Sequence, residues 1–167
     1  MNLLTLAYIV GGVGVIFEWY SYLSNRDLAF RYWSTVAALF WAIQYCLLGA
    51  WTAGLTMGLT ALRTLSSGFF YKKQYKNVTF MLFSALFVML AAISWQGIIS
   101  LLPAFAVLNT TLALFYLTGR NMRMILLASS LAWIGNDLYW HAWFALLAEC
   151  VAVGLNLRTI RRFCSNV

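Results

Sequence analysis

WIGNDLYWHAWFALLAECVAVGLNLR, residues 133–158, indicates how the whole chain is organised, because a similar pattern has already occurred once in the chain. Its first four residues correspond to Trp41-Ala-Ile-Gln44. Trp143 corresponds to Trp51 at the same offset, and the closing Gly-Leu-Asn-Leu-Arg corresponds to residues 58–63 with one residue deleted. An internal repeat with constant order and spacing indicates a fold assembled from two similar units.

The composition restricts the solvent of these units to a lipid bilayer. Of the 167 residues, 63% are hydrophobic and only 9% are charged, which leaves too little polar surface for a soluble domain. In a bilayer, backbone amides are satisfied only in helices or closed barrels. The apolar runs are continuous over roughly 17–22 residues, the length of a spanning helix, and do not alternate as barrel strands do. We therefore expect an all-α integral membrane protein.

Seven transmembrane helices are predicted. Breaks at glycines and polar residues separate the apolar segments. The expected segments are about 4–22, 32–48, 51–71, 78–95, 97–117, 124–140 and 142–162.

The basic residues predict the orientation of these helices. Every basic loop lies between the first and second, third and fourth, or fifth and sixth helices, or at the C-terminus. Such loops face the cytoplasm, which places the N-terminus in the periplasm and the C-terminus in the cytoplasm. The net charge of +7 is then a signal of topology, and nucleic acid is not an expected partner. The loop residues are Arg26, Arg31, Lys72, Lys73, Lys76, Arg120, Arg123, Arg161 and Arg162.

The repeat maps onto helices one to three and five to seven, a 3+1+3 arrangement. The expected units are a first three-helix repeat over 1–75, a linker helix over 76–96 and a second repeat over 97–167. Three helices are an odd number, so the linker restores the direction of the second copy and makes the two repeats parallel. Parallel repeats are known in transporters, where the substrate site lies between them near the midplane.

Polar side chains at membrane depth mark the candidate site. Residues i and i+3 share a helix face, so Trp41 with Gln44 and Trp133 with Asn136 each combine an aromatic wall with an amide. Such pairs suit a neutral polar ligand. The alternative is that the amides hydrogen-bond between helices while the tryptophans fill space. The full expected substrate-binding set is Trp41, Gln44, Thr60, Asn109, Trp133, Asn136 and Asn156.

Four ionisable residues are candidates for a gate or an ion pair. Arg63 lies about two turns inside its helix, and Glu18 at a similar depth is its expected partner, as a cytoplasmic gate or a buried clamp. Asp137 and Glu149 lie in the outer halves of their helices, with His141 in the turn between them. These groups could relay protons, or be partly exposed at the interface, the interpretation preferred for His141.

No enzymatic or metal-binding motif is found, and no cofactor is expected. The three cysteines lack metal-ligand spacing and are interpreted as small apolar residues. A membrane enzyme acting on lipid is a weaker interpretation, for which Asp137, His141 and Glu149 form the one candidate cluster.

Several short motifs resemble the YgjV-type bacterial inner-membrane family, over nearly the whole chain from about residue 11 to residue 162. The resemblance implies a bacterial inner-membrane location and no particular activity. The motifs are Gly11-Gly-Val-Gly-Val-Ile16, Asn25-Arg-Asp27, Leu47-Leu-Gly49, Ala53-Gly54, Leu62-Arg-Thr64 and Gly154-Leu-Asn156.

The 3+1+3 layout is also similar in architecture to SWEET and PQ-loop sugar facilitators and to PnuC-type nicotinamide-riboside carriers. The expected function is a facilitator that moves a neutral polar solute, such as a sugar, nucleoside or vitamin, by alternating access. The alternative is a sensor or assembly partner that transports nothing. The expected partners are membrane lipid and the solute, and a homo-oligomer is left open.

Overall fold

The computed structural model describes residues 2–23, 27–69, 75–117 and 119–165, and within them it contains helices and no strands. The predicted all-α class and the seven helices are confirmed for this part of the chain. The elements are α1 (Leu3–Leu23), α2 (Asp27–Leu47), α3 (Trp51–Phe69), α4 (Lys76–Ile93), the short 3₁₀ helix η2 (Ile98–Ser100), α5 (Leu101–Tyr116), α6 (Gly119–Tyr139) and α7 (Trp143–Ser165).

Two helices begin earlier than the apolar pattern predicted. α2 begins at Asp27 and α6 at Gly119, whereas the predicted starts were Tyr32 and Met124. The predicted starts were placed at the first residues of the apolar runs, and these residues mark where a helix enters the lipid. The backbone ladder can continue through polar residues outside the hydrocarbon, because helical hydrogen bonding does not depend on apolar side chains.

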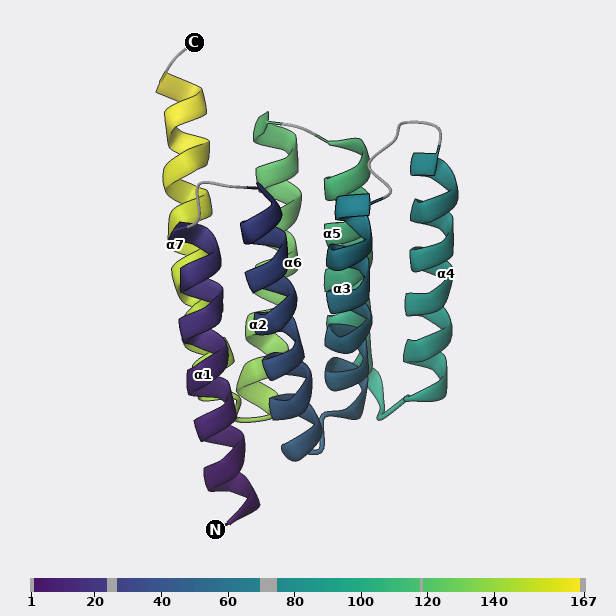
Figure 1. The fold of residues 1–167 in the computed structure, drawn as a ribbon, viewed down its shortest axis with the longest axis vertical. Helices are drawn as coiled ribbons and strands as arrows, with labels where there is room; N and C mark the ends of the chain where they lie inside the picture. The colour runs from purple at the N-terminus through teal and green to yellow at the C-terminus, as the bar shows by residue number, and fades with distance from the viewer. Residues whose placement is uncertain (1, 24–26, 70–74, 118, 166–167) are drawn as a thin grey trace.

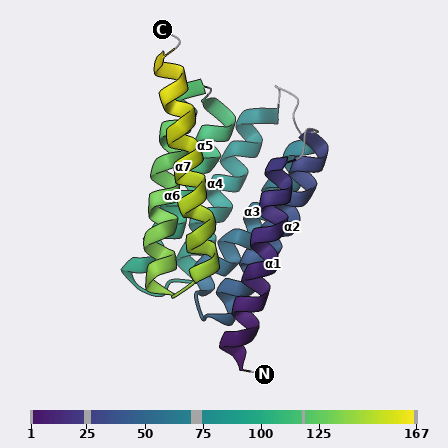
Figure 2. The same ribbon diagram turned by 90° about the vertical axis from the view of Figure 1, so that its left-hand side faces the viewer.

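The helices form two layers with α4 at one edge (Figure 1). In one layer α2 packs between α1 and α3, and in the other α6 packs between α5 and α7. The layers meet where α1 packs on α7 and where α3 packs on α5. They lean apart toward the end that carries the C-terminus (Figure 2).

The turns after α2 and α6 have the same hydrogen-bond pattern. Gly49 has a φ of 81°, and the N–H of Ala50 donates to the Tyr45 carbonyl at 2.9 Å. His141 has a φ of 54°, and the N–H of Ala142 donates to the Asp137 carbonyl, also at 2.9 Å. A left-handed residue followed by this bond ends a helix and satisfies its last carbonyls. The break predicted between the segments 32–48 and 51–71 is confirmed as this turn at Gly49 and Ala50.

Glycines allow the helices of the first layer to approach closely. A Cβ built on Gly11 would lie less than 3.0 Å from the Gln44 side chain, and one built on Gly54 would lie less than 3.0 Å from Cys46 Sγ. Between helices in lipid, where the surroundings are as apolar as the protein, close packing of small residues replaces hydrophobic burial as the driving force.

The outer surface is apolar along its length. Among the described residues, the helical stretches Leu3–Ser21 and Lys76–Ile93 are long and apolar enough to cross a membrane by length and composition. Large side chains such as Ile16, Met81 and Ile93 are mostly exposed on this surface. Contiguous exposed apolar surface of this kind is typical of contact with lipid.

A cavity between the two helical layers

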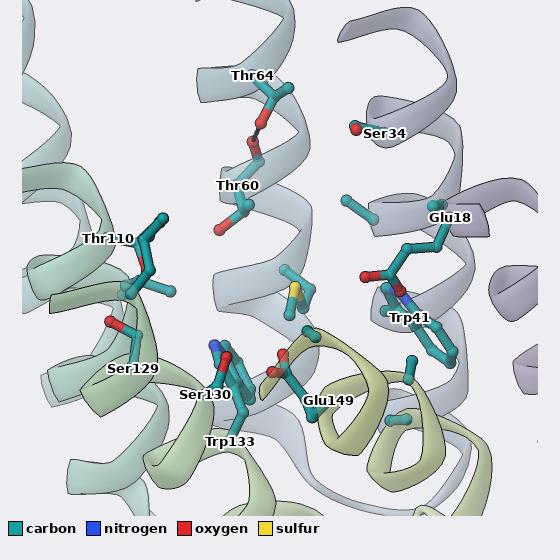
Figure 3. A pocket seen from close by; sticks show the side chains of 18 of the residues that line it. Glu18, Ser34, Trp41, Thr60, Thr64, Thr110, Ser129, Ser130, Trp133 and Glu149 are labelled. Carbon is teal, nitrogen blue, oxygen red and sulfur yellow. Dashed lines mark hydrogen bonds between the residues drawn. The ribbon is translucent and has the colours of Figure 1, made fainter. Parts of the chain in front are cut away.

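A cavity of about 760 Å³ lies between the two layers (Figure 3). Helices α1, α2 and α3 line it from one layer, and α5, α6 and α7 line it from the other. No described residue of α4 is among the lining residues. The charged and aromatic residues of the lining are Glu18, Trp41, Tyr45, Arg63, Trp133 and Glu149.

Corresponding positions of α2 and α6 line the cavity. Each lining residue of α6 follows its counterpart in α2 by 92 residues, the separation that also relates Tyr45 to Asp137. The α2 residues are Ser34, Ala37, Ala38 and Trp41, and the α6 residues are Leu126, Ser129, Ser130 and Trp133. The same separation relates Met57, Thr60 and Thr64 of α3 to Glu149, Ala152 and Asn156 of α7. Asn156 thus corresponds to Thr64, and no deleted residue is needed to match these positions.

Aromatic side chains close the cavity at the end that lies nearest to the turns after α2 and α6. The ring of Trp133 stacks on that of Tyr45, with centroids 5.8 Å apart and planes 21° from parallel. The Tyr45 hydroxyl donates a 2.5 Å hydrogen bond to Oδ1 of Asp137, which is fully buried and does not line the cavity. From these aromatic rings the lining extends along the helices toward the end of the bundle that carries the α1–α2, α3–α4 and α5–α6 connections. The Tyr45–Asp137 contact therefore joins the two layers just beyond the cavity.

Glu18 enters the cavity from α1 beside Trp41. The indole Nε1 of Trp41 donates to Oε2 of Glu18 at 2.9 Å, which fixes the carboxylate against the aromatic wall (Figure 3). A charge-assisted bond of this kind is stronger than a bond between neutral groups.

Glu149 enters the cavity from α7, in the opposite layer. Its carboxylate lies beside Ser130 of α6 (Figure 3), and the buried Oε2 atom has no hydrogen-bond partner among the described residues. Figure 3 shows Glu149 lying between Ser130 and the side of the cavity that carries Glu18. A buried carboxylate oxygen without a partner is costly, so it is a candidate for contact with a ligand.

Arg63 does not pair with Glu18 as expected. One terminal nitrogen of its guanidinium, Nη1, donates to the Thr111 hydroxyl at 2.5 Å and approaches the Val107 carbonyl at 3.5 Å, both on α5. The guanidinium carbon also lies 5.7 Å from the ring centre of Phe87 on α4. These contacts make Arg63 a link between α3, α5 and α4. Glu18 was expected as the partner because it has a similar predicted depth in the membrane, but a similar depth does not bring two side chains together.

The expected substrate-binding residues divide into two groups. Trp41, Thr60, Trp133 and Asn156 line the cavity, whereas Gln44, Asn109 and Asn136 are not among its lining residues. Gln44 is fully buried against Gly11, and the Asn136 amide donates to Asp137 at 3.4 Å. In a helix a residue at i+4 lies closer to the direction of residue i than one at i+3 does. Tyr45 therefore accompanies Trp41 on the cavity face.

Sequence reasoning missed Tyr45 and the serines of α6. Ser129 and Ser130 lie one helical turn before Trp133, and all three line the cavity. The signal was available as a stripe of small or polar residues at spacings of three and four around each tryptophan.

The groups near the turn after α6 have different environments. Asp137 is buried and hydrogen-bonded, so partial exposure is excluded for this residue, while His141 is exposed, as expected, and its ring lies 5.6 Å from that of Trp143.

An all-helical bundle with an apolar exterior, and with carboxylates, hydroxyls and aromatic rings facing a cavity between its layers, has the features of an integral membrane protein. A family model described as a bacterial inner membrane protein, Imp-YgjV, matches residues 5–166. The chain belongs to this family, and its location is the bacterial inner membrane. No curated protein and no solved structure matches the chain.

Proposed function

We propose that this protein is a multi-pass facilitator, which carries a small polar solute across the inner membrane through the cavity between its two layers. The observation that carries the proposal is the cavity itself, because three helices from each half of the chain enclose it. The volume of the cavity lies within the range found for small-molecule sites, so the cavity can hold a solute of the size of a sugar, a nucleoside or a vitamin.

Two parallel repeats related by a two-fold axis would explain the packing. Such an axis exchanges α1 with α5, α2 with α6 and α3 with α7. It then makes the α1–α7 and α3–α5 contacts equivalent, and both are present. Tyr45 and Asp137 are corresponding positions that touch each other, as residues near such an axis must. The edge position of α4 suits a linker that only reverses the chain (Figure 1).

The positions of the basic residues support one orientation of the bundle in the membrane. Lys76, Arg120 and Arg161 lie toward the end of the bundle that the cavity approaches, which supports a cytoplasmic orientation of that end. Half-exposed Trp51, Trp95 and Trp143 lie near the other end, as an interfacial belt would. Arg26, Lys72 and Lys73 of the basic loops lie outside the described residues. In this orientation, the Tyr45–Asp137 bond is a closed periplasmic gate.

Cysteine accessibility tests alternating access without knowledge of the solute. Ser129→Cys is placed in a protein whose three native cysteines are replaced by alanine, and a charged methanethiosulfonate reagent is applied to membrane vesicles of each orientation. We expect reaction from the cytoplasmic side, and additional reaction from the periplasmic side once Tyr45→Phe weakens the gate. Met81→Cys on the outer face of α4 is the matched control and should react from neither side.

The same experiment separates the facilitator from a sensor or assembly partner. A cysteine at position 129 that reacts from neither side, in either gate background, would contradict a solute pathway. Once the pathway is established, flux into proteoliposomes with a panel of sugars, nucleosides and vitamins identifies the solute. Thr60→Trp, which fills the cavity, should abolish that flux, while Met81→Trp should not.

A further inference from the structure

We propose that the cavity binds an organic cation, a solute with a protonated amine or quaternary ammonium group on an aromatic or apolar body. This inference rests on the proposed transport function and names the class of its substrate. It replaces the neutral solute expected from the sequence, because that expectation depended on the amides of Gln44 and Asn136, which do not line the cavity.

Two carboxylates face the same cavity from different layers. Glu18 comes from α1 and Glu149 from α7, the two helices that pack together along one seam of the layers. Both side chains are directed into the cavity (Figure 3). Two like charges at one site repel each other unless a cation lies between them or near them.

Among the described side chains, the hydrogen-bond donors beside these carboxylates are neutral. Trp41 donates to Glu18, and the Ser130 hydroxyl lies beside Glu149 (Figure 3), whose Oε2 atom has no partner in the described part of the chain. Among the side chains that the structure describes, no lysine or arginine forms an ion pair with either carboxylate. Arg63 also lines the cavity, but on the side of the other seam, where its guanidinium donates to Thr111 of α5.

The walls beside the carboxylates are aromatic. Trp41, Tyr45 and Trp133 line the cavity, and the last two are stacked on each other. Ring faces attract organic cations, most strongly when water is excluded, and tryptophan is the best of the aromatic side chains for this purpose. The amides that would have selected a neutral hydroxylated solute, Gln44 and Asn136, do not line the cavity. Carboxylates combined with aromatic walls therefore favour a cation over a sugar.

Three phenylethyl probes of different charge test the inference. Purified full-length protein is unfolded thermally with phenethyltrimethylammonium, 2-phenylethanol or phenylacetate, each at millimolar concentration. We expect the unfolding temperature to rise with the cation alone, in proportion to the logarithm of its concentration above the dissociation constant. Equal shifts with the cation and the alcohol, or no shift with the cation, would overturn the inference.

Charge-neutral variants locate the cation. Glu149→Gln and Glu18→Gln keep the size of each side chain and should weaken binding of the cation about tenfold or more, the change expected when one partner of a desolvated charge pair is removed. Met81→Gln on α4 is the control and should leave the affinity unchanged. If one Glu variant unfolds, the other still decides; an affinity unchanged in a folded Glu variant would overturn the site.

Flux distinguishes the two proposals. A cation that binds through Glu149 but does not cross the membrane of proteoliposomes would refute transport and leave the cation site in place. A neutral solute that is transported, by a protein that does not bind the cation, would refute the cation site and leave transport in place.

Discussion

The lining stripes of α2 and α6 occupy corresponding positions yet differ in chemistry. Both stripes carry a tryptophan, Trp41 and Trp133, but the α2 positions Ala37 and Ala38 correspond to Ser129 and Ser130 in α6. The difference continues in the neighbouring helices, where Met57 of α3 corresponds to Glu149 of α7.

The two stripes share backbone features but differ in their side chains. The turns after α2 and α6 have matching hydrogen bonds, and the lining positions match by number. The polar groups do not match, so each layer supplies different contacts. Matching turns and lining positions with different side chains suit a ligand that is itself asymmetric, such as a cation attached to a ring.

The largest effect is expected where the two halves touch at corresponding positions. Asp137→Leu removes the acceptor of the Tyr45 hydroxyl and should lower the free energy of unfolding by about 2–3 kcal/mol, the cost of a buried donor left without its charged partner. Equilibrium unfolding in mixed detergent and denaturant measures this change. Asp137→Asn keeps an acceptor and should be milder, and adding Tyr45→Phe to Asp137→Leu should recover part of the loss. An additive double variant would show that the bond does not hold the halves together.

The next effect concerns a glycine in α3 whose counterpart in α7 is a leucine. Gly54→Ala should destabilise the protein by about 1–3 kcal/mol, because the added Cβ would meet Cys46 Sγ and the backbone of α2. Gly58→Ala is the matched control in the same helix, since nothing lies within 4 Å of its Cβ position. Thermal unfolding of both variants tests the comparison, and equal changes would argue against close contact of α2 and α3 at Gly54.

The two tryptophans should differ in their dependence on the indole nitrogen. Trp41→Phe removes the donor to Glu18 and should cost about 1–2 kcal/mol of unfolding free energy beyond the loss of packing. Trp133→Phe keeps an aromatic ring to stack on Tyr45 and should be less harmful. Chemical unfolding of the two variants in parallel gives the difference. A larger loss for Trp133→Phe would reverse the roles assigned to the two side chains.

The smallest expected effects are opposite in sign at the two turns. Gly49→Ala introduces a Cβ at positive φ and should cost about 1 kcal/mol, whereas His141→Gly relieves the same conformation and should gain a few tenths to about 1 kcal/mol. Shifts of the unfolding temperature in opposite directions would support matched turns. Loss of stability in His141→Gly would show that contacts of the His141 ring outweigh its backbone strain.

Much of the fold could be predicted because it depends on local properties of the chain. Continuous apolar runs specify helices in lipid, and the separation of Trp41 from Trp133 also relates other pairs of residues that line the cavity. Gly49 marked its turn because glycine adopts positive φ at little cost. Membership in an inner-membrane family was also carried by the sequence, through motifs distributed along most of its length.

The tertiary structure alone decided which polar groups face the cavity. Lipid is as apolar as a protein core, so hydrophobicity does not tell the inner face of such a helix from the outer face. Gln44 and Tyr45 are adjacent in the sequence, yet only Tyr45 faces the cavity, because the rotation of α2 is set by packing against α1 and α3. Arg63 likewise binds Thr111 instead of Glu18, because the distance between two helices depends on how the layers pack and not on residue depth.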